Sequence, residues 1–122
     1  MALRDLLEEF KDINGFQAAG ILDFTGEILD TLSESKKIDL AVIGATFTDI
    51  LRSANEASGN IGLESTNEMQ IVTPNGVILM ASTGINAPVN AILVVILSGD
   101  GNQALAKLKI KKVIPKLIVE LG

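Results

Sequence analysis

The sequence predicts a single α+β domain spanning residues 1–122, with eight elements in the order α-β-β-α-β-β-β-α. The stretch 89–98 is apolar and rich in β-branched residues, and it lacks the alternation of a strand with one exposed face. Pro88 before it and a glycine-rich turn after it favour a strand over a buried helix, so we expect a central strand covered on both faces. Helical patterns at both ends and in the middle of the chain can supply that cover.

The composition indicates a folded chain with an aliphatic core, because 48% of the residues are hydrophobic and only 3% are aromatic. No run approaches the roughly 20 apolar residues of a membrane-spanning helix. The first residues form an acidic amphipathic segment rather than a secretory signal. We therefore expect a cytoplasmic protein without a membrane span. The absence of cysteine excludes disulfides and thiolate chemistry.

The first part of the chain predicts a helix followed by a hairpin. Apolar residues recur at steps of three and four from Leu3 to Ile13, which is typical of an amphipathic helix, and Asn14-Gly15 can end it. The runs 16–24 and 27–32 are separated by Thr25-Gly26 and indicate two paired strands.

The middle of the chain predicts the longest helix, from Ile38 to Ser58, with Asp39 or Ser35 as its N-cap. Its large apolar residues form one stripe that we expect to cover the sheet: Leu40, Ile43, Phe47, Ile50, Leu51, Ala54 and Ala57. Small residues occupy the other side, where another helix could approach closely: Ala41, Gly44, Ala45 and Thr48. A glycine inside a helix costs roughly 1 kcal/mol relative to alanine, so Gly44 points to such a contact, although a tolerated surface glycine is the alternative.

The rest of the chain predicts three strands and a helix. Residues 62–73 alternate in part and indicate a strand with one exposed face, and the turn at 73–76 leads into a second strand over 77–83. The loop 84–88 enters the central strand. The segment 102–121 is predicted to be a helix in which Pro115, lacking a backbone donor, allows a bend.

Charge is distributed unevenly, because residues 1–102 carry five basic and fourteen acidic side chains and residues 103–122 carry five lysines and one glutamate. The lysines could form a patch for an acidic partner or a membrane surface, or the solvated face of a terminal helix, which we favour; they are Lys107, Lys109, Lys111, Lys112 and Lys116. An acidic chain without Trp or Tyr is not expected to bind nucleic acid.

No catalytic, cofactor-binding or metal-binding residues are predicted. The chain contains no His, Cys or Tyr, which removes the usual nucleophile and general-base arrangements. The segment 99–102 could seat a phosphate before a helix, but it lacks the spaced lysine of a P-loop and is better explained as a turn. Asp23, Glu27 and Asp30 lack metal-ligand spacing and are expected to be solvated strand ends.

The order of elements and the glycine-punctuated apolar pattern of residues 15–28 resemble the roadblock/dynein light chain family, in its compact single-domain prokaryotic type. The resemblance implies a five-stranded antiparallel sheet between one long middle helix and two terminal helices. It also implies homodimers or heterodimers in which the middle helices lie antiparallel and the third strands pair into a ten-stranded sheet. Members act as scaffolds and regulators, including adaptors for small GTPases and proteins that bind a Ras-like GTPase and can speed its GTP hydrolysis.

From this resemblance and the two patterned surfaces we predict a dimer interface formed by eight residues: Ala41, Gly44, Ala45, Thr48, Arg52, Glu64, Thr66 and Glu68. The partners expected are a second copy or a paralogous roadblock protein, and a small Ras-like GTPase. Arginine can stabilise phosphate charge in trans, but a surface or interface ion pair, for which Glu56 is one candidate partner, is the favoured role of Arg52. The predicted function is a non-enzymatic scaffold or regulator. A small-molecule sensor of PAS-like type is the alternative, since such modules also back a sheet with helices.

Overall fold

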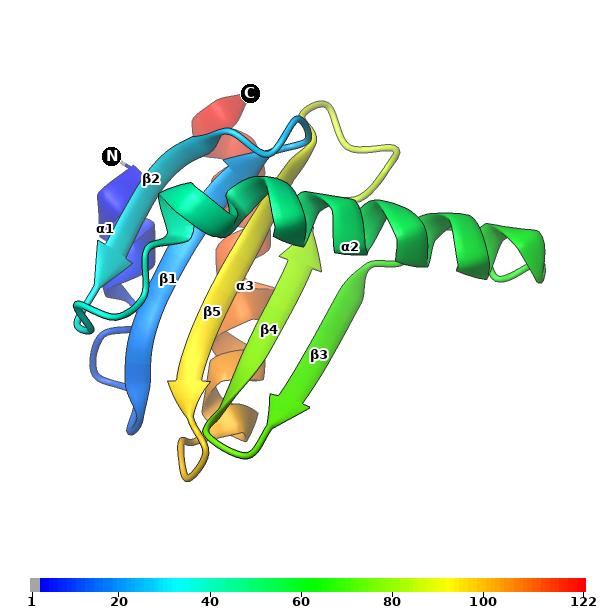
Figure 1. Cartoon of the computed structure of the whole chain (residues 1–122). Helices are drawn as coiled ribbons and strands as arrows, with labels where there is room; N and C mark the ends of the chain where they lie inside the picture. The colour runs from blue at the N-terminus through cyan, green and yellow to red at the C-terminus, as the bar shows by residue number, and fades with distance from the viewer. Residues whose placement is uncertain (1–2) are drawn as a thin grey trace.

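A computed structural model describes residues 3–122 and shows one five-stranded antiparallel sheet in the order β2-β1-β5-β4-β3. Figure 1 shows α2 crossing one face of the sheet, with α1 and α3 behind it on the other. The predicted fold class and element order are therefore confirmed. The elements are α1 (Leu3–Glu8), β1 (Phe16–Asp23), β2 (Ile28–Ser33), α2 (Leu40–Asn60), β3 (Glu68–Thr73), β4 (Gly76–Ser82), β5 (Ala91–Ser98) and α3 (Gln103–Leu121).

The central strand β5 pairs with β1 on one side and β4 on the other, as its sequence predicts. Its alternate side chains enter two separate cores. Leu93, Val95 and Leu97 pack beneath α1 and α3. Ile92 and Val94 pack beneath α2 together with Phe47. A strand covered on both faces needs no polar alternation, which explains its continuous apolar run.

The helix predicted for 3–13 is shorter in the structure, because α1 ends at Glu8. Beyond that residue the backbone continues in tight turns, with the N–H of Phe10 donating to the C=O of Leu7 and that of Ile13 to Phe10. The apolar side chains of these turns, Phe10 and Ile13, are nevertheless buried. The amphipathic pattern therefore identified the correct buried residues but overestimated the length of the helix.

The strand predicted for 62–73 is wrong over its first half, because β3 begins only at Glu68. Gly62 and Glu64 have positive φ values of 80° and 66°, which an extended strand cannot contain. Ser58 and Asn55 of α2 instead hold the segment 61–67 against the helix. The hydroxyl of Ser58 donates to the C=O of Glu64, and the side-chain oxygen of Asn55 accepts from the N–H of Thr66.

Both long helices begin at polar caps. Asp39, one of the two residues predicted to cap α2, accepts a hydrogen bond from the N–H of Ala41, and Asn102 caps α3 through the N–H of Leu105. Helix α3 continues through Pro115 to Leu121. None of the helices in the described part of the chain is long and apolar enough to cross a bilayer.

Candidate functional site

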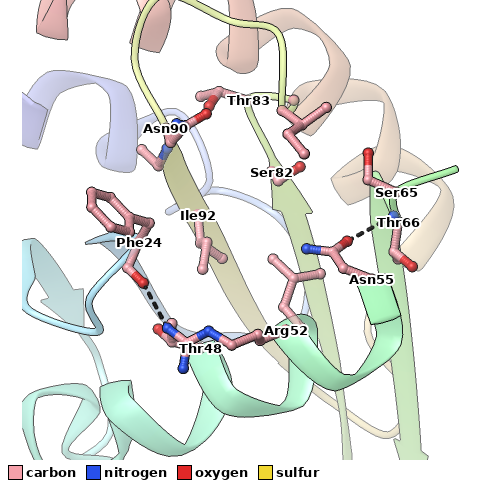
Figure 2. A pocket seen from close by; sticks show the side chains of 14 residues that line it. Phe24, Thr48, Arg52, Asn55, Ser65, Thr66, Ser82, Thr83, Asn90 and Ile92 are labelled. Carbon is pink, nitrogen blue, oxygen red and sulfur yellow. Dashed lines mark hydrogen bonds between the residues drawn. The ribbon is translucent and has the colours of Figure 1, made fainter. Parts of the chain in front are cut away.

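A cleft of about 190 Å³ lies along one flank of α2, between this helix, the end of β4 and the start of β5 (Figure 2). Leu51 and Ile92 are buried and contribute apolar surface to the cleft. Phe24 stands beside it on the β1–β2 turn and leaves 63% of its surface exposed. Arg52 and Asn55 line the cleft from α2.

Arg52 is held by two partners on its own chain. One terminal nitrogen donates to a carboxylate oxygen of Asp49 at 3.1 Å, and the other donates to the backbone C=O of Phe24 at 3.2 Å (Figure 2). The predicted ion pair of Arg52 is therefore confirmed, but its partner is Asp49, one turn before Arg52, rather than Glu56, one turn after it. The second bond joins α2 to the β1–β2 turn. Arg52 thus has a positioning role within the monomer.

The opposite flank of α2 leaves part of the sheet uncovered. A groove of about 530 Å³ runs between the first half of α2, the start of β4 and the end of β5. Partly buried apolar side chains continue from this groove toward β3, and we call this set the open apolar face: Ile43, Ile50, Met69, Ile71, Ile78 and Ile96. The last turns of α2 extend beyond β3, so no strand formed by residues 3–122 lies beneath them (Figure 1).

Strand β3 forms one edge of the sheet and pairs with β4 without a register shift. The C=O of Asn67 accepts from the N–H of Ser82, so every second residue from Asn67 onward directs its backbone groups toward β4. Glu68, Gln70 and Val72 therefore direct theirs outward, away from the sheet. An edge with regular unpaired groups is a template for another strand.

The eight residues predicted as a dimer interface fall into different environments. Ala41, Ala45 and Arg52 are exposed on α2, while Gly44 and Thr48 are buried. Glu64 and Thr66 belong to the segment folded back on α2 rather than to a strand, and Glu68 begins β3. Their participation in an interface stays a prediction.

Gly44 does not lie on a side of α2 that is free for another helix, contrary to the expectation. A Cβ atom built on Gly44 would meet the C=O oxygen of Gly26 at 2.8 Å and the side chain of Leu22 at 3.0 Å. A Cβ on Gly26 would meet the backbone of Ala45 at 2.8 Å. The two glycines therefore allow α2 to contact the β1–β2 turn of its own chain. Thr48 is also satisfied internally, since its hydroxyl donates to the C=O of Gly44.

Two carboxylates expected to be merely solvated have structural partners. Asp23 accepts hydrogen bonds from the hydroxyl and N–H of Thr25 and from the N–H of Glu27, and chiefly the hydroxyl bond holds its pKa below the ordinary value. Asp30 accepts from Arg4 at 3.1 Å and from the N–H of Thr31 at 2.8 Å. Partial burial raises the pKa of Asp30, but these two bonds outweigh it and the pKa is lowered.

Among residues 3–122, no three His, Cys, Asp or Glu side chains come together as a metal site would require. The segment 99–102 forms a turn in which the N–H of Gly101 donates to the C=O of Ser98, followed by the Asn102 cap. Sequence patterns missed the open apolar face, because they assigned Ile43 and Ile50 to the sheet-covering stripe. The width of the apolar stripe on α2 was the sequence signal that could have revealed this face.

These features define a class of domain. Helices cover both faces of one sheet, and an open edge of the sheet lies next to an apolar flank of a helix. The chain belongs to the Roadblock/LC7 domain family, whose sequence profile matches residues 3–101. The fold is similar to a Roadblock/LC7 domain from Streptomyces avermitilis, with a TM-score of 0.85, 10% identity, and coverage of 99% of this chain and 98% of that one.

Two further solved structures are similar. The gliding protein MglB from Thermus thermophilus gives a TM-score of 0.84 at 18% identity, over 98% of this chain and 89% of that one. MglC from Myxococcus xanthus gives a TM-score of 0.68 at 25% identity, over 98% of this chain and 99% of that one. A comparison with curated protein sequences found no match.

Proposed function

We propose that this protein is a non-enzymatic, dimeric regulator or scaffold of the cytoplasm that binds a small Ras-like GTPase. The observation that carries the proposal is the open apolar face next to the unpaired edge of β3. A second copy related by a two-fold axis would pair its β3 with this edge and cover the apolar side chains with its own α2. Family membership supports both the dimer and a GTPase partner, and the absence of His, Cys and Tyr supports a non-catalytic role.

The proposed dimer uses a different flank of α2 from the one that the sequence suggested. Ile43 and Ile50 would face the partner helix, whereas Gly44 is already covered by the β1–β2 turn. A paralogous roadblock chain with a similar edge could replace the second copy. The dimer can be tested by light scattering and small-angle X-ray scattering. The radius of gyration expected for compact particles is about 14 Å for one chain and about 18 Å for two, and a monomer mass at micromolar concentration would remove the dimer.

The GTPase partner is tested by binding. Each Ras-like GTPase of the native host would be purified, loaded with GDP or a non-hydrolysable GTP analogue, and titrated against the immobilised protein. We expect one of them to bind, more tightly in the GTP-like state. Failure of every GTPase in both nucleotide states would remove the functional proposal while leaving the dimer intact.

Any stimulation of GTP hydrolysis should act indirectly, by ordering the catalytic groups of the GTPase. Arg52 is the candidate for a direct contribution, but its guanidinium already bonds Asp49 and the C=O of Phe24. Arg52→Ala should therefore lower the stimulated hydrolysis rate less than tenfold, or about 1.4 kcal/mol of activation free energy. A loss of a hundredfold or more with binding unchanged would instead make Arg52 a catalytic finger.

The sensor alternative receives no support from the cleft beside Arg52. Pockets that enclose small molecules usually measure about 300–1,000 Å³, and this cleft of about 190 Å³ is smaller. The groove of about 530 Å³ on the other flank of α2 falls within that range, but we assign it to the dimer contact.

A further inference from the structure

The outer surface of α3 carries the densest positive charge of the chain. Five lysines and one glutamate lie within residues 103–122. Lys107 bonds the side chain of Gln70, and Lys116 forms an ion pair with Glu9 at 3.3 Å. Lys111 and Lys112 are exposed, and neither forms an ion pair within the described residues 3–122. Their charge is therefore available to a partner.

One apolar side chain, Leu108, protrudes between these lysines, and a second, Val119, protrudes beyond the last of them, Lys116. Leu108 leaves 59% of its surface exposed and Val119 leaves 80% exposed. Together with Lys112 and Pro115 they follow one helical stripe at steps of three and four residues. The stripe faces away from the core, because Ile110 and Val113, which lie on the other side of the helix, are buried. Lysines beside exposed apolar residues are one feature by which a helix can bind the membrane interface.

The positive charge of the molecule is concentrated on α3. Residues 103–122 carry a net charge of +4, whereas residues 3–15 carry −2 and residues 16–102 carry −7. Two of the acidic residues of 16–102 lie on the same side of the sheet as α3, because Asp30 bonds Arg4 of α1 and Glu68 lies beside Lys107. Helix α3 is therefore the part of the molecule that a negatively charged surface attracts.

The proposed dimer makes this face bivalent. Pairing two β3 edges around a two-fold axis perpendicular to the sheet leaves both α2 helices on one face and both α3 helices on the other. The two lysine-bearing helices would then lie side by side across one plane, and two linked contacts bind more tightly than one. This step rests on the dimer proposed above and does not depend on a GTPase partner.

We propose that the outer surface of α3 docks the protein onto an anionic lipid bilayer. The surface is a convex helix rather than a groove, and its apolar side chains are separated by charges. A fluid interface of headgroups and acyl chains can surround such isolated protrusions, whereas an acidic protein would need a matching groove. The acidic α2 side would then face away from the bilayer, free for a protein partner.

Vesicle binding tests the proposal. The full chain would be sedimented with large vesicles of phosphatidylcholine alone or with 30% phosphatidylserine, at 50 mM and 500 mM NaCl. We expect binding to the anionic vesicles at low salt, at least tenfold weaker binding at high salt, and no binding to neutral vesicles. Equal binding to both lipids, or to neither, would overturn the proposal.

A matched pair of charge reversals locates the surface. Lys111→Glu with Lys112→Glu should weaken binding to anionic vesicles at least tenfold. Lys36→Glu with Lys37→Glu makes the same charge change in the exposed loop before α2, where Lys37 lines the groove on the opposite face, and should change binding less than twofold. Equal losses in both variants would show attraction without a defined surface and would overturn the proposal.

Further measurements distinguish bilayer docking from loss of folding, from simple electrostatic attraction and from binding of an acidic protein. Lys111→Gln with Lys112→Gln, a milder change, should weaken vesicle binding at least threefold with an unchanged melting temperature. Leu108→Gln should weaken it at unchanged charge, which simple electrostatic attraction would not produce. Soluble poly-glutamate should not bind measurably; tight binding of this polymer without vesicle binding would replace the bilayer with an acidic protein.

Discussion

The two edge strands of the sheet, β2 and β3, differ in how far they are closed. Strand β2 carries a bulge, because Ile21 pairs with Asp30 and the next residue, Leu22, pairs with Ile28. One outward backbone group of β2, the N–H of Thr31, is occupied by the carboxylate of Asp30. Arg4 of α1 bonds the same carboxylate. Bulges, charges and neighbouring elements are devices that prevent an edge from pairing.

Strand β3 is less protected than β2. Its register with β4 is continuous, and its one charged residue, Glu68, stands at its first position. Helix α2 differs in the same way at its two ends. Near β2 it contacts the β1–β2 turn closely at Gly26 and Gly44, and near β3 it extends past the last strand (Figure 1). The comparison indicates that β3 is the edge more open to another strand, which would limit the proposed association through the sheet to two chains.

The largest expected effect comes from closing the β3 edge. Val72 is exposed and directs its N–H outward, so Val72→Pro removes a donor that β4 does not use. We expect the dimer dissociation constant to rise roughly hundredfold, equivalent to about 2.8 kcal/mol, while the monomer stays folded. Light scattering across a dilution series measures the change.

Thr31→Pro is the matched control on β2, where the outward N–H is already occupied. It should leave the mass that of a dimer, with circular dichroism reporting whether the fold is kept. A dimer that survives Val72→Pro and dissociates in Thr31→Pro would reverse the assignment of the two edges.

A smaller effect is expected where α2 is fastened to the hairpin next to β2. Gly44→Ala places a methyl group against the C=O of Gly26, and such overpacking typically lowers the free energy of unfolding by about 1–3 kcal/mol. Gly59, near the end of the same helix, has open space around it. Gly59→Ala should therefore raise stability by up to about 1 kcal/mol. Thermal unfolding of the two variants measures the difference, and a stabilising Gly44→Ala would show that the contact is loose.

The smallest effect is expected from Asp30, whose carboxylate occupies an outward N–H of the edge strand β2. Asp30→Asn keeps a side-chain oxygen for the N–H of Thr31 but loses the ion pair with Arg4, a partly exposed pair worth under about 1 kcal/mol. Asp30→Ala loses both bonds and should in addition form species larger than a dimer at high concentration. Analytical ultracentrifugation distinguishes the two, and identical masses would mean that Asp30 does not protect the edge.

The pKa of Asp30 gives this prediction a pH dependence. Because the pKa is lowered in the folded protein, the charged carboxylate stabilises the fold above the ordinary pKa, and this stabilisation is lost as the pH falls through the lowered value. The stability difference between the wild type and Asp30→Asn should therefore be present at pH 7 and disappear in acid. A difference that grew as the pH fell would contradict the assigned sign.

Features set by local sequence were predictable, and those set by tertiary contacts were not. The apolar run of β5, the hairpin turn at Gly26 and the Asp39 cap follow from neighbouring residues. The partner of Gly44 depends on a glycine eighteen residues earlier, and the partner of Arg52 is a backbone C=O of another element. Neither of these partners can be recognised from the residues next to Gly44 or Arg52 in the sequence.

The fold-back of residues 61–67 shows the same limit. Ser58 of α2 bonds the C=O of Glu64, and Glu64 has a positive φ where alternation indicated a strand. The open apolar face was partly predictable. Periodicity showed that α2 has a wide apolar stripe, but not where the helix crosses the sheet, and only that position leaves Ile43 and Ile50 incompletely covered.

The pairing of β1 with β5 also has a consequence for how the chain folds. These central strands are distant in sequence, with Ala19 opposite Val95, whereas β1–β2 and β3–β4–β5 are joined by short or moderate connections. Distant pairing requires closure of a long loop and slows folding. The two local hairpin units should therefore form early and join late. Until they join, β5 exposes a long apolar edge, and the nascent chain passes through its most aggregation-prone state just before the sheet is complete.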